Sequence, residues 1–509
     1  MPRWRPTLSP DYLACARAYG VDLAATLFLY VSISIFAGRV WRFPFDDEIY
    51  TLALGPHWTA KQLLLVYPMT EDVHPPLSYL LYWWLQHLGW SEAAMRLVSL
   101  ALTGLSLVLF QLLTLMWLVR RHGAPVALSS RLIAVLLFGL NGLAVSQGDA
   151  LRWYPLFAAL TAVAVTLYLA GSNSAARLGS AVVLGIAAST NVLAAFVALP
   201  LAVYRYGLQR RFCAPFEAAY WLLAGLFGVL GFMTVGSLLF MRYGMVGSQF
   251  VGSPIQAWLT DALGFFGGHT LGITDAWMLV PVMVISVLAM VAAIDRRQPG
   301  EPVHLLLLML LLVVVVGAFG FGKSRSFLYL VPVLAAVLTL YFDRLAHAAG
   351  RVVLMTALAV APSIAAIANI RNTPHPFKRQ SVIPYQTIFD FINTNGTGRT
   401  LVVSTDPVVP WVLSHQPGHT GRCILYFARA DTCLGGGRRY DSIFIIAGHN
   451  DRSGSAWRMA PFVQAVAQAT AGRHKVATLQ VGIDDEAALK SRLTGTPLSR
   501  HLLTIDLYR

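Results

Sequence analysis

Long apolar runs alternate with short polar segments over roughly the first 370 residues of the chain. Each run is close to the ~20 residues that a helix needs to cross about 30 Å of hydrocarbon in a bilayer. The runs predict membrane-spanning helices at 20–38, 94–119, 131–146, 155–170, 179–204, 218–240, 276–294, 303–321, 327–342 and 352–369. The sequence therefore predicts a polytopic α-helical membrane protein.

The run at 179–204 is long for one span, and its flanking arginines decide how it crosses. Arg177 precedes it and Arg205 follows it, and loops rich in arginine stay on the cytoplasmic side. We therefore expect a tight hairpin that turns near Thr190 and Asn191. With this hairpin the chain has about eleven spans, a cytoplasmic N-terminus and an extracytoplasmic C-terminal part.

After residue 370 the apolar runs shorten, and charges and prolines return. Period-two and helical patterns predict five elements, namely helices at 385–394 and 460–471 and strands at 399–404, 441–447 and 502–507. These elements predict a small α/β domain over 371–509, on the periplasmic side, after a membrane domain over 1–370. Cys423 and Cys433 lie in it and could form a disulfide, or could be buried apolar residues.

The composition agrees with a membrane protein, because 56% of the residues are hydrophobic, 12% are charged and the mean hydropathy is +0.61. The formal net charge is +14. Arginines on the cytoplasmic side, facing anionic lipid headgroups, account for this charge. No nucleic-acid partner is therefore expected.

Acidic residues are rare, 24 in 509, yet Asp46, Asp47 and Glu48 stand together directly after the first predicted span. Since Pro44 precedes them, they could fill the first turn of a helix and complement the positive end of its dipole. One of them could instead be a general base that takes a proton from an acceptor at the membrane surface. The local chemistry leaves both interpretations open.

Asp72 and His74 stand a little further on, just before Pro75 and Pro76. With a carboxylate of the first cluster they could hold a divalent metal ion through oxygen ligands and one imidazole. Alternatively, His74 caps the entry to the proline turn and hydrogen-bonds the backbone.

The first outer loop is expected over 39–93, and 77–88 is expected to form an amphipathic helix that lies in the membrane interface. The aromatic side chains of this region suit the headgroup level, or could equally be packing: Tyr79, Tyr82, Trp83, Trp84 and Trp90.

Several basic residues lie near the outer ends of spans, against the positive-inside rule, among them Arg96, Arg152, Lys323 and Arg325. Charge at this depth is costly and usually has a partner. Arg96 could pair with Glu92 at helical spacing, and Arg152 could pair with Asp149. As a set, the cations suit an anionic lipid phosphate, which arginine binds in bidentate fashion.

The order of these motifs resembles the first extracytoplasmic loop of the GT-C class of membrane glycosyltransferases, which includes protein O-mannosyltransferases and the lipid A aminoarabinose transferase. The motifs are Asp47-Glu48-Ile49-Tyr50, His74-Pro75-Pro76-Leu77-Ser78-Tyr79-Leu80-Leu81 and Ser91-Glu92-Ala93-Ala94-Met95-Arg96-Leu97. Two later segments are similar to further motifs of the class: Ala150-Leu151-Arg152-Trp153-Tyr154-Pro155 and Ser324-Arg325-Ser326-Phe327-Leu328-Tyr329-Leu330-Val331-Pro332. The resemblance covers roughly residues 20–370.

The resemblance implies an inverting transferase that takes a sugar from a polyprenyl-phosphate-linked donor. The acceptor would be an envelope glycolipid, polysaccharide or protein, at the periplasmic face of a bacterial inner membrane. Asp47 aligns with the catalytic aspartate of the class, but Asp46 departs from the pattern, so either could be the base, with Glu48 in support. Arg325 is the first candidate for the donor phosphate, followed by Lys323, Arg152 and Arg96.

Two other classes of function remain open. Many spans with charge at membrane depth would suit a transporter or flippase of lipid-linked sugars. In a noncatalytic membrane scaffold, the carboxylates of the first loop would be helix caps.

Overall fold

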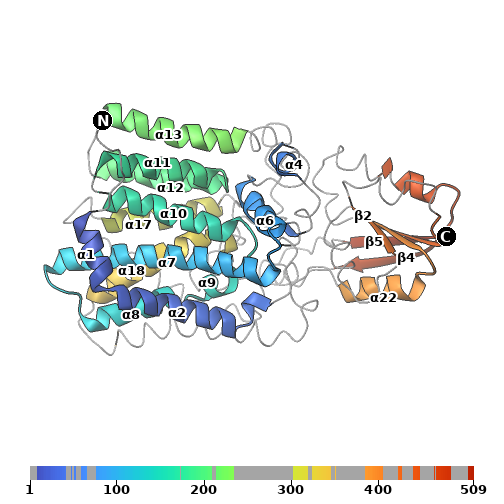
Figure 1. Ribbon diagram of the computed structural model, residues 1–509, viewed down its shortest axis with the longest axis horizontal. Coiled ribbons are helices and arrows are strands. Elements are labelled where there is room, and N and C mark those ends of the chain that lie inside the picture. Colours follow the sequence, from blue (N-terminus) through green and yellow to red (C-terminus); the bar gives the residue numbers. More distant parts are fainter. Residues whose placement is uncertain are drawn as a thin grey trace. The chain divides into compact units, whose positions relative to one another are not determined.

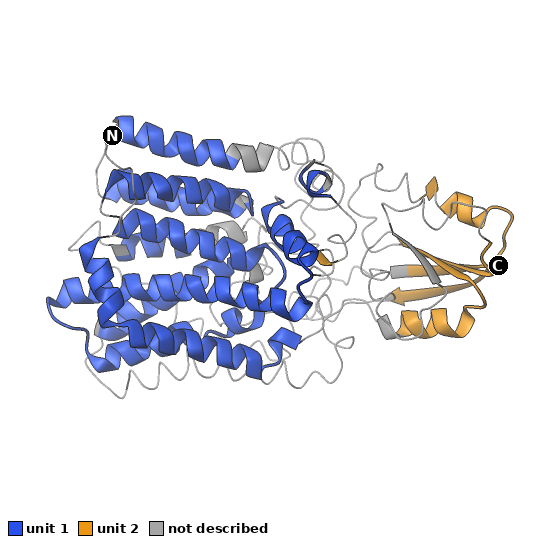
Figure 2. Cartoon of the chain, in the orientation of Figure 1, with its two compact units in different colours: residues 1–42, 59–239, 252–372 blue, residues 43–58, 240–251, 373–509 orange. Residues whose placement is uncertain are grey.

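The computed structural model describes residues 9–41, 48, 51–52, 59–65, 76–171, 173–208, 214–233, 302–318, 324–344, 350, 385–404, 422–426, 439–447, 463–464, 466–482 and 502–509. The chain divides into two compact units, which Figure 2 colours separately. One unit comprises 1–42, 59–239 and 252–372, and the other comprises 43–58, 240–251 and 373–509.

The first unit is helical (Figure 1). Its elements are α1 (Pro10–Ala18), α2 (Gly20–Phe36), η1 (Arg39–Trp41), α4 (Ala60–Leu65), α6 (Leu77–His87), α7 (Glu92–His122), α8 (Leu128–Gly139), α9 (Gly142–Gln147), α10 (Trp153–Ala170), α11 (Ser174–Ala188), η3 (Val192–Ala194), α12 (Ala195–Ala202), the π-helical η4 (Val203–Leu208), α13 (Ala214–Met233), α17 (Pro302–Ala318), η6 (Ser324–Leu330) and α18 (Val331–Arg344). Helix α7 packs against α2, α8, α10 and α18, so it lies at the centre of this unit.

Local chemistry explains the ends of the long helix α7. The Ser91 side chain accepts a hydrogen bond from the amide of Ala94, and Glu92 occupies the first turn. At the other end, basic residues occupy the last turn and Gly123 takes a left-handed φ of 61°. A serine N-cap and a left-handed glycine are both common at helix ends, because they satisfy the unpaired backbone groups there at little cost in free energy.

Among the described residues, three helical segments are long and apolar enough to cross a membrane: Glu92–His122, Leu128–Gln147 and Trp153–Ala170. A fourth arises if α1 and α2, which meet at 66°, form one bent span. The predicted spans at 276–294 and 352–369 lie outside the described residues, so the total of eleven stays a prediction.

The helix is interrupted near Thr190 and Asn191, where the hairpin was expected to turn; the hairpin and its two cytoplasmic ends stay a prediction. Helix α11 ends at Ala188 and the chain becomes helical again at Val192. The Thr190 hydroxyl donates to the Ala187 carbonyl over 2.6 Å, and the Asn191 side chain accepts from the Leu193 amide over 2.9 Å. These side chains satisfy backbone groups that the interrupted helix leaves open.

The second unit contains a five-stranded sheet, built from β1 (Thr400–Ser404), β2 (Arg422–Tyr426), β3 (Ser442–Ala447), β4 (Lys475–Gly482) and β5 (Leu502–Tyr508). The strand order is β2-β1-β3-β5-β4. Strand β1 runs parallel to both of its neighbours, whereas β5 runs antiparallel to β3 and β4.

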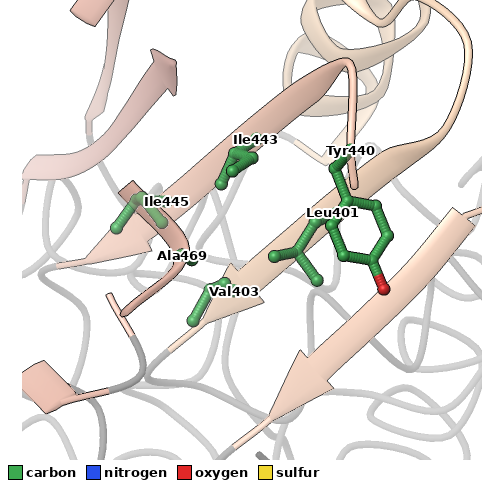
Figure 3. Close-up of a cluster of buried hydrophobic side chains, with 6 residues drawn as sticks. All are labelled: Leu401, Val403, Tyr440, Ile443, Ile445 and Ala469. Atoms are coloured by element: carbon green, nitrogen blue, oxygen red, sulfur yellow. The ribbon is translucent and has the colours of Figure 1, made fainter. Parts of the chain in front are cut away.

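Both faces of the central strands are covered. Figure 3 shows one side, where buried side chains of β1 and β3 gather with two residues from outside these strands: Leu401, Val403, Ile443, Ile445, Tyr440 and Ala469. Phe444 points to the opposite side and meets Phe391 of α22 (Tyr385–Asn395) edge to face, with 5.9 Å between the ring centroids. Burial on both faces explains why β1 and β3 read as continuous apolar runs.

The helix and the three strands predicted at 385–394, 399–404, 441–447 and 502–507 are present as α22, β1, β3 and β5. The backbone is also helical at 463–464 and 466–470, inside the predicted 460–471. Strands β2 and β4 were not predicted. Cys423 lies in β2, whereas Cys433 lies outside the described residues, so their disulfide stays a prediction.

Candidate functional site

The described residues cover only part of the predicted site. Glu48 is completely buried, and Arg96 and Arg152 are buried as well. Arg325 belongs to η6, of which the backbone is described. Asp46, Asp47, Asp72, His74 and Lys323 lie outside the described residues.

A buried ion cluster lies at the turn between α9 and α10, centred on Asp149. Arg39 donates from Nε and Nη2 to Asp149 Oδ1 over 3.1 and 2.7 Å. Arg96 Nη1 donates to Asp149 Oδ2 over 3.2 Å, and its Nη2 donates to Glu92 Oε1 over 2.6 Å. One carboxylate thus joins η1, α7 and the α9–α10 turn.

The cluster explains how two arginines can be buried in an apolar bundle. Asp149 and Arg96 are fully buried, and Arg39 is 4% exposed. Buried charges are tolerated when each one is paired and hydrogen-bonded. The pairing of Arg96 with Glu92 at helical spacing, one of the two alternatives for Arg96, is present.

Arg39 was not among the predicted site residues. Its position at the outer end of the first span is the same signal that singled out the other outer cations. Its guanidinium also donates to the Ser146 carbonyl, and the Thr103 hydroxyl donates to the Gly148 carbonyl over 3.1 Å. Side chains from α7 and η1 therefore fix the backbone that leads into the turn.

Gly148 is required at the start of this turn. A Cβ atom there would overlap the Tyr30 hydroxyl, the Ala144 carbonyl oxygen and the Thr103 methyl group. The missing side chain allows α2, α7 and the end of α9 to approach closely.

Helix α6 holds the other end of the turn. The Tyr82 hydroxyl lies 2.8 Å from Ser99 Oγ of α7, and 3.2 and 3.3 Å from the carbonyl oxygens of Ala150 and Arg152. Tyr79 accepts a hydrogen bond of 2.6 Å from Arg152 Nη1. The Arg152 guanidinium also lies over the Tyr79 ring, 5.5 Å from its centroid.

These contacts decide between the two interpretations of the aromatic residues near α6. Tyr79 and Tyr82 are buried at 3% and 0% exposure, so they are packing and not headgroup contacts. Trp84 and Trp90 are exposed, as an interfacial position requires.

Two segments far apart in the sequence meet beside Arg152. Helix α10, which begins at Trp153, packs against η6. Phe157 and Tyr329 form an edge-to-face ring pair with centroids 4.8 Å apart. The motif around Arg152 and the motif around Arg325 are therefore carried by neighbouring elements.

Three arginines lie at the turn. Arg39 and Arg96 pair with Asp149, Arg96 also pairs with Glu92, and Arg152 donates to Tyr79. A guanidinium is a side chain that binds phosphate well. Among the residues that the structure describes, no three His, Cys, Asp or Glu side chains come together as a metal site.

No protein-family model and no curated protein matches the chain. Its structure is similar to the crystal structure of ArnT from Cupriavidus metallidurans bound to undecaprenyl phosphate, with 13% sequence identity, a TM-score of 0.51, and coverage of 96% of this chain and 98% of that chain. The apo state of the same protein aligns at 12% identity and a TM-score of 0.40, over 97% and 98% of the two chains. At such low identity the first similarity concerns the fold alone. The chain therefore has the GT-C fold that its sequence motifs predict, with apolar helices typical of a membrane protein.

Proposed function

We propose that this protein is an inverting glycosyltransferase of the bacterial inner membrane. It transfers a sugar from a polyprenyl-phosphate-linked donor to an envelope glycolipid, polysaccharide or protein at the periplasmic face. The observation that carries the proposal is the buried Arg152 at the start of α10, the helix that packs against the η6 segment of Arg325, in a chain with the GT-C fold. The solved ArnT structure contains undecaprenyl phosphate, which is the carrier that such a donor would have.

The donor phosphate is the leaving group of the reaction. Arg152, Lys323 and Arg325 bind it and stabilise the negative charge that it gains as the bond to the sugar breaks. Arg96, which already pairs with Glu92 and Asp149, adds positive charge from behind and keeps the turn of Arg152 in place.

The acceptor hydroxyl attacks the anomeric carbon from the side opposite the phosphate. Asp47 takes the hydroxyl proton, while the new carbon–oxygen bond forms and the polyprenyl phosphate leaves with its electron pair. A single displacement of this kind inverts the anomeric configuration. Asp46 is the alternative base, and the buried Glu48 supports whichever aspartate acts.

A divalent ion, if the transfer uses one, would be held by Asp72 and His74. Carboxylate oxygen and imidazole nitrogen are suitable ligands for such an ion. Its place in the proposal is tested separately from that of the base.

The test is transfer from a mixed pool of polyprenyl-phosphate sugars to a membrane extract by the purified protein, with and without EDTA. We compare wild type, Asp47→Asn and Asp46→Asn, with Asp11→Asn as a control on an exposed aspartate of α1. Loss of a general base lowers the rate by roughly 10²–10⁴-fold, and we expect this loss for Asp47→Asn only.

The remaining outcomes separate the parts of the proposal. Loss of transfer in EDTA, restored by a divalent ion, assigns the metal, whereas unchanged transfer leaves His74 as a cap. Equal activity of Asp47→Asn and wild type would remove Asp47 as the base, and a loss in Asp46→Asn would then assign the role to Asp46. A protein that neither transfers sugar nor binds polyprenyl phosphate would point to a transporter or a scaffold.

A further inference from the structure

One side chain of α6 contacts Arg152 in two ways. The Tyr79 hydroxyl accepts a hydrogen bond of 2.6 Å from Arg152 Nη1. The Arg152 guanidinium also lies over the Tyr79 ring, 5.5 Å from its centroid. Because Tyr79 is neutral, this contact orients the guanidinium and places no negative charge beside it.

The main chain at Arg152 is fixed by the same helix. Tyr82, one turn after Tyr79 on α6, places its hydroxyl next to the carbonyl oxygens of Ala150 and Arg152 and next to Ser99 of α7. Tyr79 and Tyr82 are both buried. The backbone and the guanidinium of Arg152 are therefore both held by buried side chains of one rigid element.

We propose that Tyr79 is a positioning residue, which holds the Arg152 guanidinium in the orientation that binds the donor phosphate. The inference rests on the proposed function, and it adds a residue that no sequence motif indicated for this role. An arginine side chain has many rotamers, and fixing it on binding costs entropy. The hydrogen bond and the cation–π contact with Tyr79 restrict those rotamers before the lipid arrives, so less entropy is lost when the phosphate binds.

Four variants test the role of Tyr79. Tyr79→Phe keeps the ring and removes the hydroxyl, whereas Tyr79→Leu removes both contacts. Arg152→Gln removes the cation, and the double variant Tyr79→Phe/Arg152→Gln asks whether the two residues act as a unit. Trp84→Phe, at an exposed aromatic residue of the same helix, is the matched control.

The measured quantity is the dissociation constant of the purified full-length protein for undecaprenyl phosphate, with undecaprenol as a lipid that lacks the phosphate. A hydrogen bond to a charged group is worth about a tenfold change in affinity. We therefore expect Tyr79→Phe to weaken binding of undecaprenyl phosphate roughly tenfold and Tyr79→Leu to weaken it further. Binding of undecaprenol, which reports an intact lipid site, stays at the wild-type value in both variants and in Trp84→Phe.

The double variant separates positioning from general stability. If Tyr79 acts through Arg152, Tyr79→Phe has no further effect once Arg152→Gln is present. An equal effect in both backgrounds, or an equal loss of undecaprenol binding, overturns the positioning role.

The experiment also separates this inference from the proposed function. If Arg152→Gln weakens binding and Tyr79→Phe does not, only the role of Tyr79 fails. If Arg152→Gln itself binds undecaprenyl phosphate as tightly as wild type does, the phosphate contact in the proposed function fails, and the inference fails with it.

Discussion

Asp149→Asn is the substitution that most directly tests the buried ion cluster. It keeps the size of the side chain and removes one negative charge between two arginines. The remaining oxygen can still accept from Arg39, but the new amide group turns an N–H donor toward Arg96. Glu92, whose side chain is 31% exposed, still pairs with Arg96, but the contact between Arg39 and the Asp149 carboxylate loses its negative charge.

The expected magnitude follows from the burial of these groups. The side chains of Asp149 and Arg96 are 0% exposed and that of Arg39 is 4% exposed. Removing one partner of a buried ion pair leaves an uncompensated charge and costs about 3 to 5 kcal/mol. We expect a loss of this size in the free energy of unfolding, because water does not reach the arginines to replace the carboxylate.

The assay is unfolding of the purified protein in one detergent, followed by tryptophan fluorescence during titration with denaturant. Asp11→Asn is the control, because Asp11 pairs with Arg120 over 2.9 Å at exposures of 64% and 49%. An exposed pair of this kind contributes at most about 1 kcal/mol. Equal losses in the two variants would refute the argument from burial, whereas a further replacement of Arg39 by Met should recover part of the loss in Asp149→Asn.

Two further predictions use the same unfolding assay. Gly185→Ala in α11 places a Cβ atom against Phe227 of α13 and should lower the free energy of unfolding by about 1–3 kcal/mol. Gly225→Ala is the control, because open space surrounds this glycine, and it should raise the free energy of unfolding by up to about 1 kcal/mol. Equal effects would show that α11 and α13 are not packed this closely. Glu217→Gln removes the charge that pairs with the buried Arg205 over 2.8 Å and should cost about 3 kcal/mol; a loss below about 1 kcal/mol would mean that water reaches this pair.

The pattern along the chain was enough to locate most helices, since their apolar content and their end signals are local. The ends of α7 are encoded by Ser91 and Gly123, and the break after Ala188 by two polar residues within an apolar run. The pairing of Arg96 with Glu92 could also be predicted from the sequence, because residues four apart on a helix are neighbours in any tertiary context.

Other features depended on segments that meet only in the folded chain. Strands β2 and β4 are the two edge strands of the sheet, and each is identified by its hydrogen bonds to one neighbouring strand. The spacing of charges suggests Asp149 as a partner for Arg152. It could not indicate that Asp149 pairs with Arg39, because these two residues are 110 positions apart in the sequence.

The sequence by itself thus determined which segments are helices, through their apolar pattern, and which charged residues stand at the outer ends of those helices. The tertiary structure decided that Arg39 and Arg96 meet Asp149 and that Arg152 meets Tyr79. The physical reason is that the cost of burying a charge is offset by whichever group the helix packing places within hydrogen-bonding distance. That choice depends on how the helices pack, and residues 39, 79, 96, 149 and 152 come together only through that packing.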